Sequence, residues 1–165
     1  MAFNAVLLWL HVFSGASWLG AVMLFAMVVG PTIGDFSPAT SGEVVVKMLP
    51  KYLRFIVILT LLTPILGLVA LLASSNGDFG VFSPNTSFGA YMSAGAILSL
   101  ITWLVTFAVV YPTGRKIVKI TEEFVKNQTP QPSGLPRLAM RLKISSGIGL
   151  ALLLAILVCM VAAAA

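Results

Sequence analysis

The composition of this 165-residue chain sets its broad class. With 59% hydrophobic residues, 9% charged residues and a mean hydropathy of +1.04, the chain has too little polar surface to cover a soluble domain. These values exclude a separate soluble domain and predict an integral membrane protein in the lipid bilayer. The net charge of +5 is explained by membrane topology and attraction to anionic lipids, so nucleic acid is not an expected partner.

Four apolar stretches along the chain are long enough to cross a bilayer. They cover about residues 4–30, 52–73, 88–111 and 144–164. Pro31 is expected to end the first span, Pro112 follows the third, and turn-rich segments separate the others. The sequence therefore predicts a single all-α transmembrane domain over residues 1–165, an integral membrane up-down four-helix bundle.

The basic residues predict the orientation of the spans. All ten Lys and Arg residues fall in the first and third loops, and the middle loop, around Asp78, has none. They are Lys47, Lys51, Arg54, Arg115, Lys116, Lys119, Lys126, Arg137, Arg141 and Lys143. By the positive-inside tendency, both basic loops face the cytoplasm and both termini face outward. We therefore expect a multi-pass protein of the cell membrane.

The segment after Pro112, GRKIVKITEEFVKN, is amphipathic. It carries Ile117, Ile120 and Phe124 on one helical face and Lys and Glu on the others. This pattern predicts a helix that lies on the cytoplasmic surface of the membrane as an extension of the third span.

Small residues recur at every fourth position of the fourth span. The stripe consists of Gly147, Ala151, Ala155 and Cys159. Small residues at this spacing let membrane helices approach closely, so we expect the stripe to face another helix and not lipid. Packing is also the favoured interpretation of Cys159, the only cysteine.

Pro64 lies in the middle of the second span. Because proline has no N–H and crowds the carbonyl four residues earlier, a kink is expected there. The hydroxyls of Thr60 and Thr63 are expected to satisfy the backbone groups that Pro64 frees.

The only histidine, His11, lies within the first span, in the stretch LLWLHVFSGASWLGAVMLF. No Asp, Glu, Lys or Arg lies deep in any span, which disfavours proton pumps, ion-coupled transporters and voltage sensors. The spans also lack the residue sets of hydrolytic and phosphoryl-transfer enzymes. His11 is therefore the one chemically versatile group within the membrane, and it is expected to face the bundle interior.

Depth in the bilayer selects the neighbours expected for His11. It lies about 10 Å inside the outer end of its span, and Met92 and Met160 lie at a compatible level in the third and fourth spans. An imidazole and a thioether form an axial pair for haem b, and both also suit Cu(I). Trp18 and Gly20 would offer an aromatic wall and close backbone approach. The alternative is structural: His11 bonds Ser14, a threonine or a backbone carbonyl across the bundle.

The stretch LHVFSGASWLGAVMLFAMVVGP, followed by LRF at the head of the second span, resembles the start of the CopD-like membrane proteins and of the HemJ group. The matching residues are His11, Trp18, Gly20, Pro31 and Arg54-Phe55, and the resemblance covers the first two spans, about 70 residues. It implies either copper uptake, as in CopD-like domains, or haem b binding linked to protoporphyrinogen oxidation, as in HemJ-like proteins.

The chain departs from both groups. It has no second histidine for bis-histidine ligation of haem within the chain, and its methionines form no dense series for a copper pathway. The leading prediction is a haem-binding protein of electron transfer, with His11 as the metal ligand. A third class stays open, an accessory subunit without cofactor that packs in a larger membrane complex or a homo-oligomer.

Overall fold

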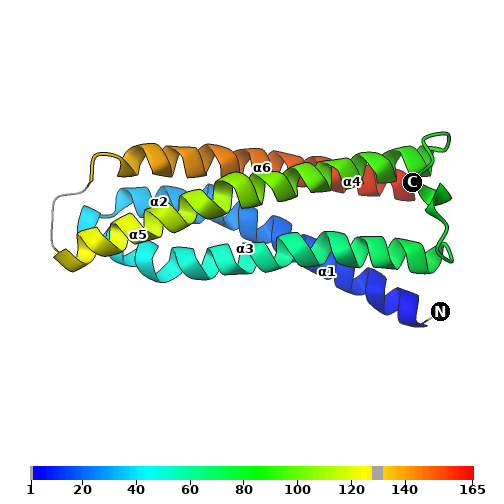
Figure 1. Ribbon diagram of the computed structural model, residues 1–165, viewed down its shortest axis with the longest axis horizontal. Coiled ribbons are helices and arrows are strands. Elements are labelled where there is room, and N and C mark those ends of the chain that lie inside the picture. The colour runs from blue at the N-terminus through cyan, green and yellow to red at the C-terminus, as the bar shows by residue number, and fades with distance from the viewer. Residues whose placement is uncertain (1, 128–131) are drawn as a thin grey trace.

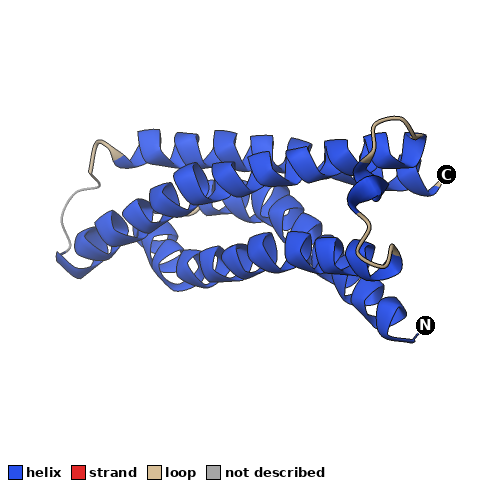
Figure 2. Ribbon diagram, turned by 45° about the vertical axis from the view of Figure 1, so that its right-hand side comes forward, coloured by secondary structure: helices blue, strands red, loops and turns tan. Residues whose placement is uncertain are grey.

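A computed structural model describes residues 2–127 and 132–165 as an all-α chain (Figures 1 and 2). No strand occurs in these two ranges, which confirms the predicted fold class. The elements are α1 (Ala2–Leu24), η1 (Phe25–Val29), α2 (Gly30–Asp35), α3 (Pro38–Ser74), η2 (Phe79–Phe82), α4 (Ser87–Val105), η3 (Thr106–Val110), α5 (Tyr111–Asn127) and α6 (Leu135–Ala164).

These elements join into four continuous helices that are long and apolar enough to cross a membrane, as predicted. They run over Phe3–Asp35, Pro38–Ser74, Ser87–Asn127 and Leu135–Ala164. Both termini and the loop before α4 lie at one end of the bundle (Figure 1). The opposite end carries the basic segments, which continue the helices well beyond the about 20 residues that a bilayer requires.

The helices continue beyond the predicted spans at the basic end. The second helix begins at Pro38 and not near residue 52, the third continues to Asn127 and not to about residue 111, and the fourth begins at Leu135 and not near residue 144. Hydropathy marks only the apolar part of a helix, whereas these helices keep packing on one another where their outer faces become polar.

Pro31, which was expected to end the first span, and Pro112, which was expected to follow the third, both lie inside continuous helices. Each is the second residue after a five-residue π-helical turn, η1 or η3. The sequence at the end of the π turn is VVGPT in the first case and VVYPT in the second. The N–H before each proline bonds five residues back, from Gly30 to Phe25 and from Tyr111 to Thr106. The wider turn accommodates the proline ring, which would otherwise crowd the carbonyl four residues earlier, so both helices continue.

The bundle consists of two helical hairpins. The first hairpin pairs α1 with α3 and the second pairs α4 with α6 (Figure 1). Two buried clusters join them: Trp18, Val22, Ile56, Leu59, Leu153 and Ile156 in one, and Leu49, Leu53, Val110, Ile117, Val118 and Leu142 in the other.

Helix α5 continues the third span as a helix, as predicted, and its apolar face packs against α3. The apolar face of α5 enters the second cluster through Ile117 and Val118. Gly114 and Gly42 allow the close approach, since an added Cβ would lie 2.7 Å from Leu53 and 2.8 Å from Val125, respectively. An amphipathic pattern suits a membrane surface or a helix partner equally, and here α3 is the partner.

The small-residue stripe of α6 is also placed differently from its prediction. Gly147 and Ala151 are exposed, and an added Cβ at Gly147 would contact nothing within 4 Å. At the outer end, Cys159 approaches Gly95 of α4, at 3.7 Å from an added Cβ. The buried face of α6 carries Leu142, Ser145, Ser146, Leu153 and Ile156. In the basic half of α6, the buried small residues are therefore Ser145 and Ser146 and not Gly147.

Candidate functional site

His11 joins α1 to α3. Its side chain is 9% exposed, and Nδ1 lies 2.9 Å from the backbone carbonyl oxygen of Thr63. The Ser14 hydroxyl donates a hydrogen bond to the His11 carbonyl, within the same helix. The hydrogen bond to a carbonyl across the bundle, expected of a structural histidine, is thus present, and His11 faces the interior of its hairpin.

This hydrogen bond determines the tautomer of the imidazole. A carbonyl oxygen only accepts hydrogen bonds, so Nδ1 carries the proton and donates it to Thr63. In the neutral ring, Nε2 is then unprotonated and holds a lone pair. The hydrogen bond of the ring within the described residues is made by Nδ1, and Nε2 lies on the side of Gly67, 3.3 Å from an added Cβ there. The arrangement leaves one ring nitrogen free to act as an acceptor or a metal ligand.

Gly67 provides the space for the imidazole. An added Cβ at this position would lie 2.6 Å from Cε1 and 2.8 Å from Nδ1 of His11. The ring therefore occupies the volume that a side chain of α3 would otherwise fill. Sequence reasoning missed Gly67, and the only signal was a glycine three residues after Pro64 in a span of bulky residues.

Two hydroxyls near this contact have no hydrogen-bond partner. The Oγ1 atoms of Thr60 and Thr63 are buried and unpaired within the described part of the chain. The prediction that they satisfy the groups freed by Pro64 is therefore wrong. In the second hairpin, Thr102 and Thr106 donate to the carbonyls of Leu98 and Thr102, and the buried hydroxyl of Ser146 has no partner in the described part of the chain. The first hairpin thus keeps unused hydrogen-bonding capacity beside His11.

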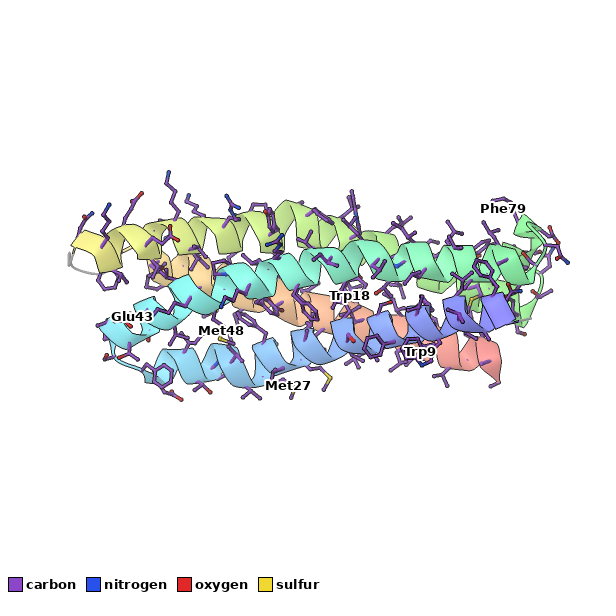
Figure 3. All side chains as sticks on the ribbon, turned by 90° about the horizontal axis from the view of Figure 1, so that it is seen from below. Trp9, Trp18, Met27, Glu43, Met48 and Phe79 are labelled. Atoms are coloured by element: carbon purple, nitrogen blue, oxygen red, sulfur yellow. The ribbon has the colours of Figure 1, made fainter. Side chains whose placement is uncertain are left out.

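Trp18 and Gly20 lie on different faces of the first helix. Trp18 is 2% exposed and belongs to the core cluster with Leu59 and Ile156, whereas Trp9 is 62% exposed (Figure 3). Gly20 is exposed, and an added Cβ would contact nothing within 4 Å. Within the chain, Trp18 is a packing residue, and Gly20 brings no other helix close.

Met92 and Met160 belong to the second hairpin, on α4 and α6. The His11 ring is turned toward Thr63 and Gly67 of α3. The outer end of α1 also lies apart from α4 and α6 in both ribbon views (Figures 1 and 2). The structure therefore does not pair the imidazole with either methionine, although all three residues lie toward the same end of the bundle.

Two cavities of the bundle lie apart from His11. The larger one is an open groove of about 520 Å³ between α4 and α6, and the smaller has about 20 Å³. His11 lines neither of them. The described residues also contain no group of three or more His, Cys, Asp or Glu that could hold a metal ion. The tautomer of His11 fits an axial ligand of haem, but these cavities do not enclose a porphyrin around it.

Comparison with known proteins adds no assignment to this geometry. No family model, no curated protein and no solved structure matches the chain. The resemblance of the first two spans to CopD-like and HemJ-like proteins therefore stays a prediction, which rests on His11, Trp18, Gly20 and Pro31.

Proposed function

We propose that this chain is a multi-pass membrane protein that supplies His11 as one axial ligand of a b-type haem for electron transfer. The haem would be held between this chain and a second copy of it or another membrane subunit. The observation that carries the proposal is the hydrogen bond from Nδ1 to the Thr63 carbonyl, which leaves Nε2 as the free ring nitrogen.

The chemistry of metal-bound histidines supports this use of the bond. A ligating imidazole usually donates its other N–H to a carbonyl or carboxylate, which fixes its tautomer and orientation. Thr63 supplies such a carbonyl, and Gly67 supplies the room for the ring. When bound, haem b supplies a one-electron redox centre whose potential depends on its axial ligands. His11 would orient that centre, while the apolar helices exclude water.

A shared site follows from the space around His11. Neither the groove at Arg137 and Arg141 nor the small cavity at Trp18 is lined by His11, so in this proposal a further protein surface would enclose the porphyrin. A second histidine toward the haem would have to come from that surface, since the chain has only His11. This arrangement combines the haem prediction with that of a subunit in a complex.

The proposal includes an orientation in the membrane. All ten basic residues belong to segments at the end of the bundle opposite to the termini (Figure 1). The positive-inside tendency then assigns the basic end to the cytoplasm. A reporter fused after Ala165 should be active outside the cytoplasm, and a cytoplasmic reporter would contradict this orientation.

The absorption spectrum and metal content of the full-length protein test the haem proposal. The protein, purified from membranes of cells supplied with haem, should show a Soret band. His11→Gly should insert into the membrane but lose the band, and added imidazole should restore it. Ser17→Gly, a half-buried position on the same helix, is the matched control and should keep the band.

Each other outcome favours a different function. Bound copper in place of haem would support the copper interpretation. A wild-type protein without haem or copper, or an unchanged spectrum in His11→Gly, would make His11 a structural residue and leave the accessory subunit as the better account.

A further inference from the structure

An open groove of about 520 Å³ lies between the second hairpin's two helices, at the basic end of the bundle. Val105 and Val109 line it from α4 and η3, and Ile144 and Ile148 line it from α6. Arg137 and Arg141 close the end nearest the start of α6. The groove is therefore lined by apolar atoms, and two arginines flank one end of it.

The groove begins outside the hydrocarbon core of the bilayer and ends within it. Eleven residue steps lead from Arg137 to Ile148 on α6, which corresponds to roughly 16 Å at the rise of an α-helix. Because the predicted fourth span begins near residue 144, Arg137 and Arg141 lie at the headgroup level, and Ile144 and Ile148 reach the adjoining part of the hydrocarbon core. The headgroup end of an acyl chain fits these limits, whereas a further transmembrane helix would need a surface that crosses the whole core.

Arg137 and Arg141 form no ion pair with another described residue. They lie four residues apart, on one face of α6, and both are exposed. The one ion pair among the described residues joins Lys47 and Glu43 on α3, so no carboxylate there neutralises either arginine. A guanidinium binds a phosphate through two parallel hydrogen bonds, which makes Arg suited to a phosphodiester at the membrane surface.

We propose that this groove binds one anionic glycerophospholipid of the leaflet at the basic end. Arg137 and Arg141 hold the phosphate, and one acyl chain lies along the valines and isoleucines. The site is independent of His11 and of any haem. The cationic group of a zwitterionic lipid would be repelled by the two arginines, whereas an anionic lipid has a net negative charge, so the site selects anionic lipids.

Native mass spectrometry of the full-length protein tests this site. The protein is incubated with phosphatidylglycerol and phosphatidylcholine of identical acyl chains, and the retained lipid is counted. We expect one retained phosphatidylglycerol, with a roughly 25-fold preference over phosphatidylcholine, because each basic residue contributes about a fivefold factor at a membrane surface. A wild-type protein that retains neither lipid, or both equally, would overturn the proposal.

Two double variants, which remove the same number of positive charges, distinguish specific lipid binding in the groove from general attraction of lipid to the basic surface. Arg137→Gln/Arg141→Gln should abolish the preference. Lys119→Gln/Lys143→Gln removes the same charge at exposed positions outside the groove and should keep most of it. Equal losses in the two variants would mean that only the overall surface charge attracts lipid.

A third variant tests the apolar part of the groove. Ile148→Trp fills its deep end while both arginines remain, so lipid retention should fall severalfold. Unchanged retention would contradict an acyl chain in the groove. Displacement of the lipid by glycerol phosphate would assign the arginines to a free phosphate, and a cross-linked second copy in the groove would replace the lipid by a protein contact.

Discussion

The two hairpins share a backbone design and differ in their interiors. Both contain a π-helical turn directly before an X-Pro-Thr sequence, so each first helix passes its proline without ending. In the first hairpin a side chain, His11, bonds across to the partner helix. In the second hairpin, Thr102, Thr106 and Ser145 bond only to carbonyls of their own helices.

This difference in side-chain hydrogen bonding separates a hairpin that serves mainly as a scaffold from the hairpin that contains the candidate site. Hydroxyls that bond within their own helix satisfy themselves and leave the helices to pack as a scaffold. Buried hydroxyls without a partner among the described residues occur in both hairpins, at Ser146 in the second and at Thr60 and Thr63 in the first. Only in the first hairpin do they accompany an imidazole that bonds across to the partner helix. Because unpaired buried polar groups destabilise a fold, the two hydroxyls near His11 support the proposed functional use of the first hairpin.

Trp18→Ala should have the largest effect on stability. Trp18 is 2% exposed and packs with Leu153 and Ile156, so it joins the first hairpin to the second. We expect a loss of about 3–5 kcal/mol in the free energy of unfolding, measured by denaturation in detergent. Trp103 of the second hairpin is 38% exposed, and Trp103→Ala should cost much less. Equal losses would show that Trp18 does not hold the hairpins together.

A glycine from each hairpin provides the next comparison. Gly67→Ala would place its Cβ 2.6 Å from His11 Cε1, whereas Gly95→Ala would meet only Cys159, at 3.7 Å. We expect Gly67→Ala to cost about 1–3 kcal/mol through overpacking and to shift the imidazole. Gly95→Ala should be close to neutral or stabilising. Thermal unfolding of the two variants measures the difference, and the reverse order would refute the tight fit of the ring.

Threonine variants give the smallest predicted effect. Thr60→Val removes a hydroxyl that has no partner in the described chain, so it should be neutral or stabilise the fold by up to about 1 kcal/mol. Thr102→Val removes a hydroxyl bonded to Leu98 and should cost about 0.6 kcal/mol. If Thr60→Val destabilises the protein more than Thr102→Val, the Thr60 hydroxyl is paired in the native membrane.

Much of the fold could be predicted from the sequence, because long apolar runs reveal membrane helices directly. The helical extensions could not, since Pro38 and Leu135 begin helices in polar segments that hydropathy does not mark. The passage of Pro31 and Pro112 through π turns was missed because proline usually indicates a helix end.

The candidate site was predictable only in part. His11 was found because it is the one ionisable group deep in the spans. Depth along a helix follows from counting residues, but the direction of a side chain around the bundle does not. For this reason Met92 and Met160 were predicted as neighbours, whereas Gly67 and the Thr63 carbonyl are the groups that the structure places against the ring.

Nitrogen NMR of the imidazole tests the central claim most directly. His11 is the only histidine, so selective labelling of histidine gives signals from one ring alone. For the neutral imidazole of the protein in lipid bilayers, we predict a protonated Nδ1 and an unprotonated Nε2, and we expect the Nε2 signal to shift or broaden when haem is bound. A protonated Nε2 beside a bare Nδ1 would contradict the hydrogen bond to Thr63 and remove the free nitrogen on which the proposed function depends.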